Sequence, residues 1–225
     1  MRVLVVDTAL DLCSAGVFDV DGGEARVLGL RSEAMAKGHQ ERLAGMVRDA
    51  VAEAGGFGGV DRIGVTVGPG SFTGLRVGLA FAQGLGAALD RPVVGLSTLD
   101  GLAASAGGDG AVAALIDARR GQVYARFWRD GAAQGPAEAL SLEAARDRVA
   151  AWGSGARLIG SGAALIADGA PDAAVMDLPG PTPEALARLT AAADPAASPP
   201  RPVYLRAPDA TPPTRLPGQP RPPAP

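Results

Sequence analysis

The chain has 225 residues, a formal net charge of −3 and an apolar share of 47%. This acidic balance argues against a protein that binds nucleic acid by itself, since such proteins carry a basic face. The single cysteine, Cys13, excludes an internal disulfide and indicates a reducing, cytoplasmic location. A membrane span is not expected, because Arg76, Gln83 and Asp90 interrupt the most apolar stretch.

The N-terminal part of the chain predicts a three-stranded meander and a helix. Residues 2–8 form an apolar strand pattern that ends in Asp7 and Thr8. Residues 13–19 and 26–31 predict two more strands, joined by a hairpin turn. A helix is expected over residues 39–54, since its apolar side chains recur at helical spacing.

The next stretch predicts a strand, a glycine-rich loop and a second helix. Residues 63–67 are mostly β-branched, residues 68–74 are rich in Gly, and the helix continues to Leu89 before a strand at 92–96. Small residues recur at every fourth position of this helix: Gly74, Gly78, Ala82 and Gly86. A glycine in a helix lowers stability by about 1 kcal/mol relative to an alanine at the same position. We therefore expect the glycines to serve a purpose, namely to let the backbone of this helix come close to another element.

The loop before this helix matches neither of two common nucleotide motifs. Gly68 and Gly74 are one residue too far apart for a P-loop, and Thr73 replaces the third glycine of a dinucleotide fingerprint. A tight turn with Ser71 or Thr73 as helix cap explains the pattern, and an anion site at the helix N-terminus is the alternative.

A second, smaller set of elements follows. Residues 111–117 and 122–129 predict a hairpin, residues 141–151 a helix, 157–160 a short strand and 182–193 a final helix. We therefore expect two lobes, at residues 1–103, which include the glycine loop, and 104–193.

The C-terminal part differs in composition from the rest. Twelve of the nineteen prolines lie in residues 194–225. A segment with so few apolar residues cannot bury enough surface to fold by itself. We expect residues 202–206 to dock on the first lobe and the rest of the tail to be disordered.

Several sequence blocks resemble the TsaB family of tRNA threonylcarbamoyladenosine biosynthesis proteins. The most specific block is GPGSFTGLRVG at residues 68–78. Similar blocks occur at residues 4–8, 39–43, 117–124 and 202–206, so the resemblance covers roughly residues 1–206.

The resemblance implies an α/β fold of the two-lobed, actin-like ATPase (ribonuclease H-like) class, with mixed sheets flanked by helices. In such a fold Asp7, Thr8 and Asp117 would be vestigial nucleotide contacts. It implies that this chain alone needs no cofactor, and that ATP or ADP binds weakly or at a subunit interface.

The catalytic sibling of this family carries an H-x-x-x-H pair that binds metal. The corresponding positions here are Thr98 and Leu102, which cannot replace two imidazoles. We therefore expect no metal site and no catalytic residue in this chain. His39, the only histidine, is expected at the start of a helix.

The resemblance implies a non-catalytic dimerisation subunit of the complex that transfers a threonylcarbamoyl group to N6 of the adenosine 3′ of the anticodon in ANN-decoding tRNAs. Its implied partners are a TsaD-like catalytic sibling, a TsaE-like ATPase and tRNA held through the complex, with a homodimer also open. The implied partner interface lies on the helices at 39–54 and 74–89, at Leu43, Met46, Val47, Leu75, Gly78, Leu79 and Ala82. The alternatives are a stand-alone actin-like ATPase or small-molecule kinase and, third, a metallopeptidase-like protein.

Overall fold

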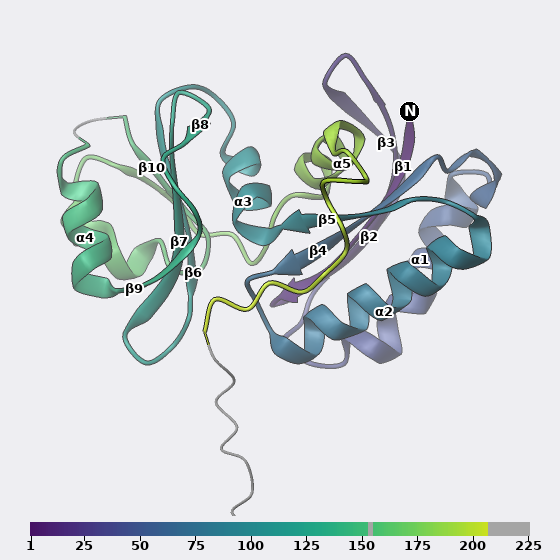
Figure 1. The fold of residues 1–225 in the computed structure, drawn as a ribbon, viewed down its shortest axis with the longest axis horizontal. Coiled ribbons are helices and arrows are strands. Elements are labelled where there is room, and N and C mark those ends of the chain that lie inside the picture. The colour runs from purple at the N-terminus through teal and green to yellow at the C-terminus, as the bar shows by residue number, and fades with distance from the viewer. Residues whose placement is uncertain (153–154, 207–225) are drawn as a thin grey trace, which may run out of the picture.

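A computed structural model describes residues 1–152 and 155–206 of the chain. Two α/β lobes lie side by side, each built on its own sheet (Figure 1). The segment predicted to be disordered beyond residue 206 lies outside the described residues.

The first lobe is built on a five-stranded mixed sheet. Its strands, in spatial order, are β3 (Glu24–Ala34), β2 (Leu12–Asp21), β1 (Arg2–Leu10), β4 (Arg62–Gly68) and β5 (Val93–Ser97). The first three form an antiparallel meander, and β4 and β5 run parallel to β1. The five strands predicted for this part of the sequence are therefore confirmed.

The central strand β1 is apolar on both faces. Leu4 and Val6 point into one core, and Val3 and Val5 point into another on the opposite side of the sheet. A strand with two buried faces reads as a continuous apolar run, as residues 3–6 do. Helices must therefore cover both faces of the sheet.

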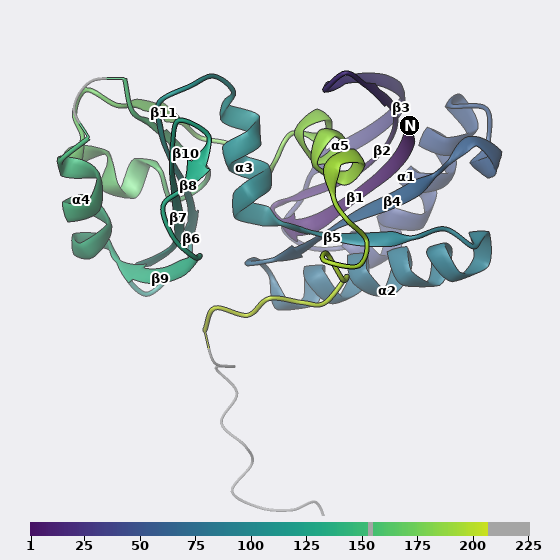
Figure 2. The ribbon, with the colours of Figure 1, turned by 45° about the horizontal axis from the view of Figure 1, so that its top comes forward.

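Two pairs of helices provide this cover (Figure 2). α1 (His39–Glu53) and α2 (Phe72–Leu89) lie side by side on one face. α3 (Thr98–Ala106) and α5 (Pro183–Ala192) lie on the other, with α3 between the two sheets.

The placement of α5 corrects the sequence interpretation, which assigned this helix to the second lobe. Leu186 and Ala187 pack against Val3, Val5 and other residues of the first sheet. A Cβ at Gly64 of β4 would overlap the side chain of Thr190, so the helix lies directly on the sheet. The apolar second face of β1 requires such a cover.

The second lobe is smaller. Its sheet has the order β11-β10-β6-β7-β8, with β9 also paired to β7. The strands are β6 (Ala111–Asp117), β7 (Gln122–Arg129), β8 (Ala132–Ala133), β9 (Glu138–Ser141), β10 (Arg157–Ile159) and β11 (Ala174–Met176). Helix α4 (Leu142–Ala150) covers one face, and α3 packs on the other through Leu99 and Leu102.

After a turn at residues 194–198, the chain continues to residue 206 as a strap along the first lobe. The Gly95 amide donates to the Ser198 carbonyl at 2.9 Å, and the Gln83 side chain donates to the Pro200 carbonyl at 2.7 Å. Further on, the Val203 amide donates to the Val67 carbonyl at 2.8 Å. The prediction that docking is confined to residues 202–206 is therefore wrong: it begins at Ser198, because the backbone of β5 offers a free donor there.

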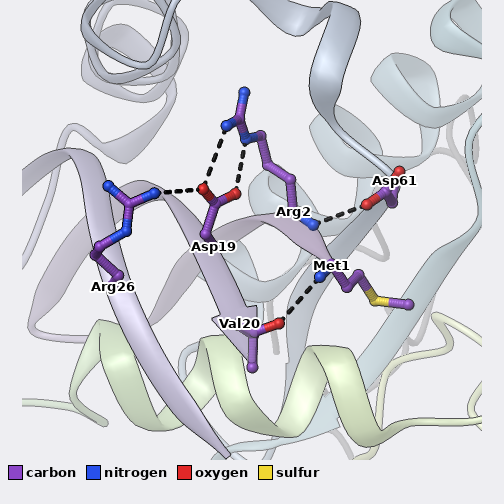
Figure 3. A network of polar contacts seen from close by, with 6 residues as sticks. All are labelled: Met1, Arg2, Asp19, Val20, Arg26 and Asp61. Atoms are coloured by element: carbon purple, nitrogen blue, oxygen red, sulfur yellow. Dashed lines mark hydrogen bonds and ion pairs between the residues drawn. The ribbon is translucent and has the colours of Figure 1, made fainter. Parts of the chain in front are cut away.

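The start of β1 is held by a polar network around Asp19 (Figure 3). Arg2 Nε donates to Asp19 Oδ1 at 2.9 Å, and Arg26 donates to Asp19 Oδ2 at 2.7 Å. The amide of Arg2 donates to Asp61 Oδ2 at 2.7 Å. These contacts join β1, β2, β3 and the start of β4 at one end of the sheet.

This network makes stability depend on pH. The side-chain hydrogen bond from Arg2 holds the pKa of Asp19 below its usual value. The ionised form therefore stabilises the fold above pH ~4, and this contribution is lost as the pH falls through the lowered pKa. We expect Asp19→Asn to lower Tm at pH 7 by about 2 °C. The difference from the wild type should shrink towards pH 3 in thermal unfolding followed by circular dichroism.

Asp21→Asn, on the same strand, is the matched control because Asp21 forms no ion pair with another described residue. A pH-independent effect of Asp19→Asn would contradict the assignment.

Candidate functional site

The glycine loop and α2 are docked tightly on the end of β1. Cβ atoms at Gly70 and Gly74 would overlap the carbonyl oxygens of Ala9 and Thr8, respectively. Ser71 is the N-cap of α2, and its hydroxyl accepts a hydrogen bond from the Gly74 amide at 3.3 Å. The loop is therefore the capped turn that the sequence allowed.

The small residues along α2 face the lobe's own sheet. A Cβ at Gly78 would overlap the Thr8 hydroxyl, and one at Gly86 would overlap Val93 of β5. Ala82 is fully buried. The predicted close approach is confirmed, and the approaching elements belong to the same chain: β1 at Gly74 and Gly78, and β5 at Gly86.

The residues predicted for the partner interface are therefore wrong, because they are buried in the lobe. All seven residues are buried, and the six with side chains are at most 5% exposed: Leu43, Met46, Val47, Leu75, Gly78, Leu79 and Ala82. The apolar stripe of each helix covers the sheet, so these residues cannot contact another protein without unfolding the lobe.

A different set of residues points outward from the same two helices. We define the outward face of α1 and α2 by its exposed or half-buried small and polar residues: Ala44, Gly45, Arg48, Ala52, Ala80, Gln83, Gly84, Ala87 and Ala88. Apart from the chain neighbours and the backbone of the same helix, no described atom lies within 4 Å of a Cβ placed at Gly45 or Gly84. Nothing in the described part of the chain therefore requires glycine at these two mid-helix positions, although each glycine destabilises its helix. Sequence reasoning missed them because they lie outside the four-residue stripe.

The two lobes enclose a cleft of about 600 Å³. It is lined by the β1–β2 turn and Ser71 from the first lobe, and by Asp117, Arg119 and Tyr124 from the second. Asp117 accepts a hydrogen bond from the Arg119 amide at 2.7 Å and pairs with its guanidinium at 3.0 Å. Arg119 and Arg120 both have positive φ, at 61° and 56°, which is uncommon for side chains of this size.

Asp7 and Thr8, predicted as nucleotide contacts beside Asp117, do not line this cleft. Thr8 is 1% exposed, and its hydroxyl donates to the Gly74 carbonyl at 2.7 Å. Asp7 is fully buried, and its Oδ1 accepts from the Thr66 hydroxyl at 2.7 Å and from the Ala9 amide at 2.9 Å. The prediction is wrong for both residues, because α2 closes over Thr8 and the segment at Gly180 packs beside Asp7.

A threonine and a leucine occupy the positions of the sibling's metal ligands here. Thr98 and Leu102 lie in α3 and are fully buried. Among the residues that the structure describes, no group of three or more His, Cys, Asp or Glu side chains could hold a metal ion.

α2 is the one described helix with the length and mean hydropathy of a membrane span, 18 residues and 1.2. The sequence interpretation took Arg76 and Gln83 as interruptions, but these two residues do not lower the hydropathy enough to exclude it. The core helix of a water-soluble domain satisfies the same criteria, and α2 packs across β1 and β4.

A family model described as "TsaD: tRNA N6-adenosine threonylcarbamoyltransferase" matches residues 24–145, just over half of the chain. An uncharacterized protein of Mycobacterium tuberculosis H37Rv is 38% identical over 218 residues, which cover 93% of this chain and 94% of that protein. TsaB of Escherichia coli K12 is 37% identical over 135 residues, 58% of this chain and 56% of the relative. A Mycobacterium leprae relative is 42% identical over 130 residues, only 36% of its length. The chain thus matches about half or less of these last two relatives.

A crystal structure from Pseudomonas aeruginosa, described as an uncharacterized protein with similarity to peptidase YEAZ, has the same fold. It is 32% identical, with a TM-score of 0.74, and the match covers 91% of this chain and 99% of that one. A structure described as YeaZ from the same organism is 30% identical to this chain, with a TM-score of 0.72.

These comparisons confirm the predicted class, a two-lobed α/β fold of the actin-like, ribonuclease H-like type. The chain belongs to the TsaB family.

The two kinds of glycine in α2 should respond oppositely to the same substitution. Gly78→Ala should lower the free energy of unfolding, since its Cβ would overlap the Thr8 side chain. Gly84→Ala should raise it by about 1 kcal/mol, because the site is open and alanine is the better helix former. Urea unfolding of both variants measures the difference, and equal effects would contradict this placement of α2.

Asp7 generates a second prediction. Burial raises the pKa of its carboxyl, opposed by the hydrogen bond from Thr66, and Oδ2 has no partner among the described residues. The neutral form is therefore favoured in the fold, and that stabilisation is lost as the pH rises through the raised pKa. Asp7→Asn retains an acceptor for Thr66 and Ala9, so we expect Tm at pH 7.5 to rise by about 3 °C.

The gain from Asp7→Asn should disappear towards pH 4 in the same thermal unfolding experiment. A variant less stable than the wild type at pH 7.5 would mean that the carboxylate has a partner it needs.

Proposed function

We propose that this protein is a non-catalytic scaffold subunit in the cytoplasmic complex that transfers a threonylcarbamoyl group to N6 of the adenosine 3′ of the anticodon in ANN-decoding tRNAs. Membership in the TsaB family supports the pathway, since the E. coli relative is named a tRNA threonylcarbamoyladenosine biosynthesis protein. The acidic balance of the chain supports a role in which tRNA is held through the complex.

The outward face of α1 and α2 is the observation that carries this proposal. Gly45 and Gly84 each destabilise a helix, and no described residue of the chain occupies the space beside them. Small residues on two adjacent helices allow the helices of another protein to approach closely. The proposed partner on this face is a TsaD-like catalytic sibling, and a second copy of this chain is the alternative.

The interlobe cleft is where we propose that a nucleotide in contact with Asp117 would bind. Asp117, Arg119 and Tyr124 line it, but the carboxylate of Asp117 is already engaged by Arg119. ATP or ADP would therefore bind weakly here, or at a subunit interface. A TsaE-like ATPase would supply nucleotide turnover to the complex.

A second candidate comes from the peptidase named in the P. aeruginosa description. In this chain the two positions of the sibling's histidine pair are the buried Thr98 and Leu102, which supply no metal ligand. Cleavage of a peptide substrate by the purified protein would favour this candidate, and ATP turnover by the chain alone would favour an actin-like ATPase or kinase.

Reconstitution with one component left out tests the proposal. Unmodified tRNA, threonine, bicarbonate, ATP, the adenylate-forming enzyme, the sibling and the small ATPase are mixed with or without this protein. Modified nucleoside is then quantified by mass spectrometry. We expect product only when this protein is present and none from this protein alone. Equal product without it would overturn the scaffold role.

Gly84→Arg tests the surface in the same assay. The site is exposed and open, so the free variant should keep its circular-dichroism spectrum. Its association with the sibling should weaken at least tenfold by analytical ultracentrifugation, and product should fall accordingly. Ala132→Arg, an exposed substitution in β8 of the second lobe, is the matched control and should change neither. Unchanged association of Gly84→Arg would reject the outward face as the interface.

A further inference from the structure

The chain uses arginine almost everywhere that it needs a cation, with one exception. Of its 21 basic residues only Lys37 is a lysine, and His39 is the only histidine. The two residues flank Gly38, and all three border a single hollow. A compact ammonium and an imidazole, each used once in 225 residues, thus lie at the same place on the surface.

The hollow has a volume of about 300 Å³ and lies where two helices begin. Residues 36–41 at the start of α1 form one side, and Ser71, Thr73, Gly74 and Val77 at the start of α2 form the other. Both helices are long, with 15 and 18 residues, so each directs the positive end of its dipole towards this region.

The start of α1 lacks the side-chain cap found on the other four α-helices of the described chain. Its N-cap is Gly38, at φ 89°, which offers no oxygen to the first-turn amides. The Glu41 amide donates to the Gly38 carbonyl at 3.2 Å, but no side chain accepts from the amides of His39 and Gln40 within the described residues. Uncapped amides at a helix N-terminus are donors available to an anion.

His39 supplies a separate observation. The residue is 7% exposed, and its Nε2 atom is buried without a hydrogen-bond partner in the part of the chain that the structure describes. A buried polar atom without a partner is costly and therefore rare in a native fold. His39 lines the hollow, and a ligand there would give this buried nitrogen its partner once the ring turns to expose it.

The charges around the hollow favour an anion. Lys37 is exposed and forms no ion pair with another described residue. Glu41 is the opposing charge at the rim, and one of its oxygens accepts from the Gln40 side chain at 3.1 Å. The ammonium and two helix N-termini outweigh this single, exposed carboxylate.

We propose that this hollow is a binding site for a phosphoryl group, held by Lys37, His39 Nε2 and the first-turn amides of α1. Donors from a side-chain ammonium, a ring nitrogen and the backbone suit a tetrahedral oxyanion with several acceptor oxygens better than a planar carboxylate. Ser71 borders both this hollow and the interlobe cleft, so the glycine loop separates two different sites. The inference does not rest on the proposed function.

Thermal unfolding and isothermal titration calorimetry of the full chain with inorganic phosphate test the site. Phosphate should raise Tm relative to chloride at equal ionic strength and pH. Lys37→Ala should weaken phosphate binding about tenfold, as loss of a charge-assisted hydrogen bond does. Glu41→Gln should strengthen it, because a repulsive charge is removed.

His39→Phe distinguishes binding from a structural role. The substitution keeps a ring but removes the unpartnered nitrogen, so the variant should be at least as stable as the wild type in chloride. It should nevertheless lose most of the phosphate-dependent rise in Tm. Arg48→Ala, which removes one cation from the same helix outside the hollow, is the matched control and should bind phosphate like the wild type.

The source of the phosphoryl group is resolved by comparing inorganic phosphate with ADP. Tighter binding of ADP that is also lost in Lys37→Ala would identify a nucleotide, and equal affinities would identify free phosphate. No phosphate-specific rise in the wild type, or a rise that persists in both Lys37→Ala and His39→Phe, would overturn the proposal.

Discussion

The first lobe depends on the approach of the α2 backbone to β1 at Thr8. Gly74 and Gly78 leave no room for a side chain there, and the Thr8 hydroxyl donates to the Gly74 carbonyl in the resulting contact. The backbone of α2 packs directly on Thr8, with no side chain of α2 between them. The position of α2 along β1 is therefore fixed. That fixed position removes Thr8 from the interlobe cleft and determines which residues of α2 point to solvent.

The second constraint is the apolar character of β1 on both faces. One face is covered by α1 and α2, the first two α-helices of the chain. The other is covered by α5, which begins more than 160 residues after β1. The chain must therefore leave the first lobe, build the second and return. The strap that follows α5 continues along β5 and α2, and Arg206 then donates to the Ala118 carbonyl of the second lobe at 3.1 Å. Both lobes are thus held by the last described residues.

This architecture explains what the sequence could predict. Strands β1 to β5 and helices α1 and α2 follow from apolar periodicity and turn residues, because each buries a long, regular pattern. Strands β8, β9 and β11 have two to four residues and carry no pattern of that kind. The periodicity of α5 predicts a helix but not the sheet it covers. The same limit applies to the site: periodicity located the apolar stripes of α1 and α2, but a stripe that covers its own sheet looks the same as one that covers a partner.

Glycines help to distinguish a helix face that covers its own sheet from one that covers a partner, according to whether a Cβ at the glycine would meet another element. A glycine such as Gly78 lies where the fold excludes a Cβ, so it is explained by the fold itself. Gly45 and Gly84 weaken their helices although a Cβ there would meet no neighbouring element of the described chain, which fits a surface that another protein approaches. The unpartnered, buried Nε2 atom of His39 is also a local cost, and it lies at the start of α1. Local costs of this kind are expected at functional or strained sites, where they are compensated elsewhere in the fold or by a ligand. These features make the surface formed by α1 and α2, rather than the cleft between the lobes, the place where we propose that this lobe acts.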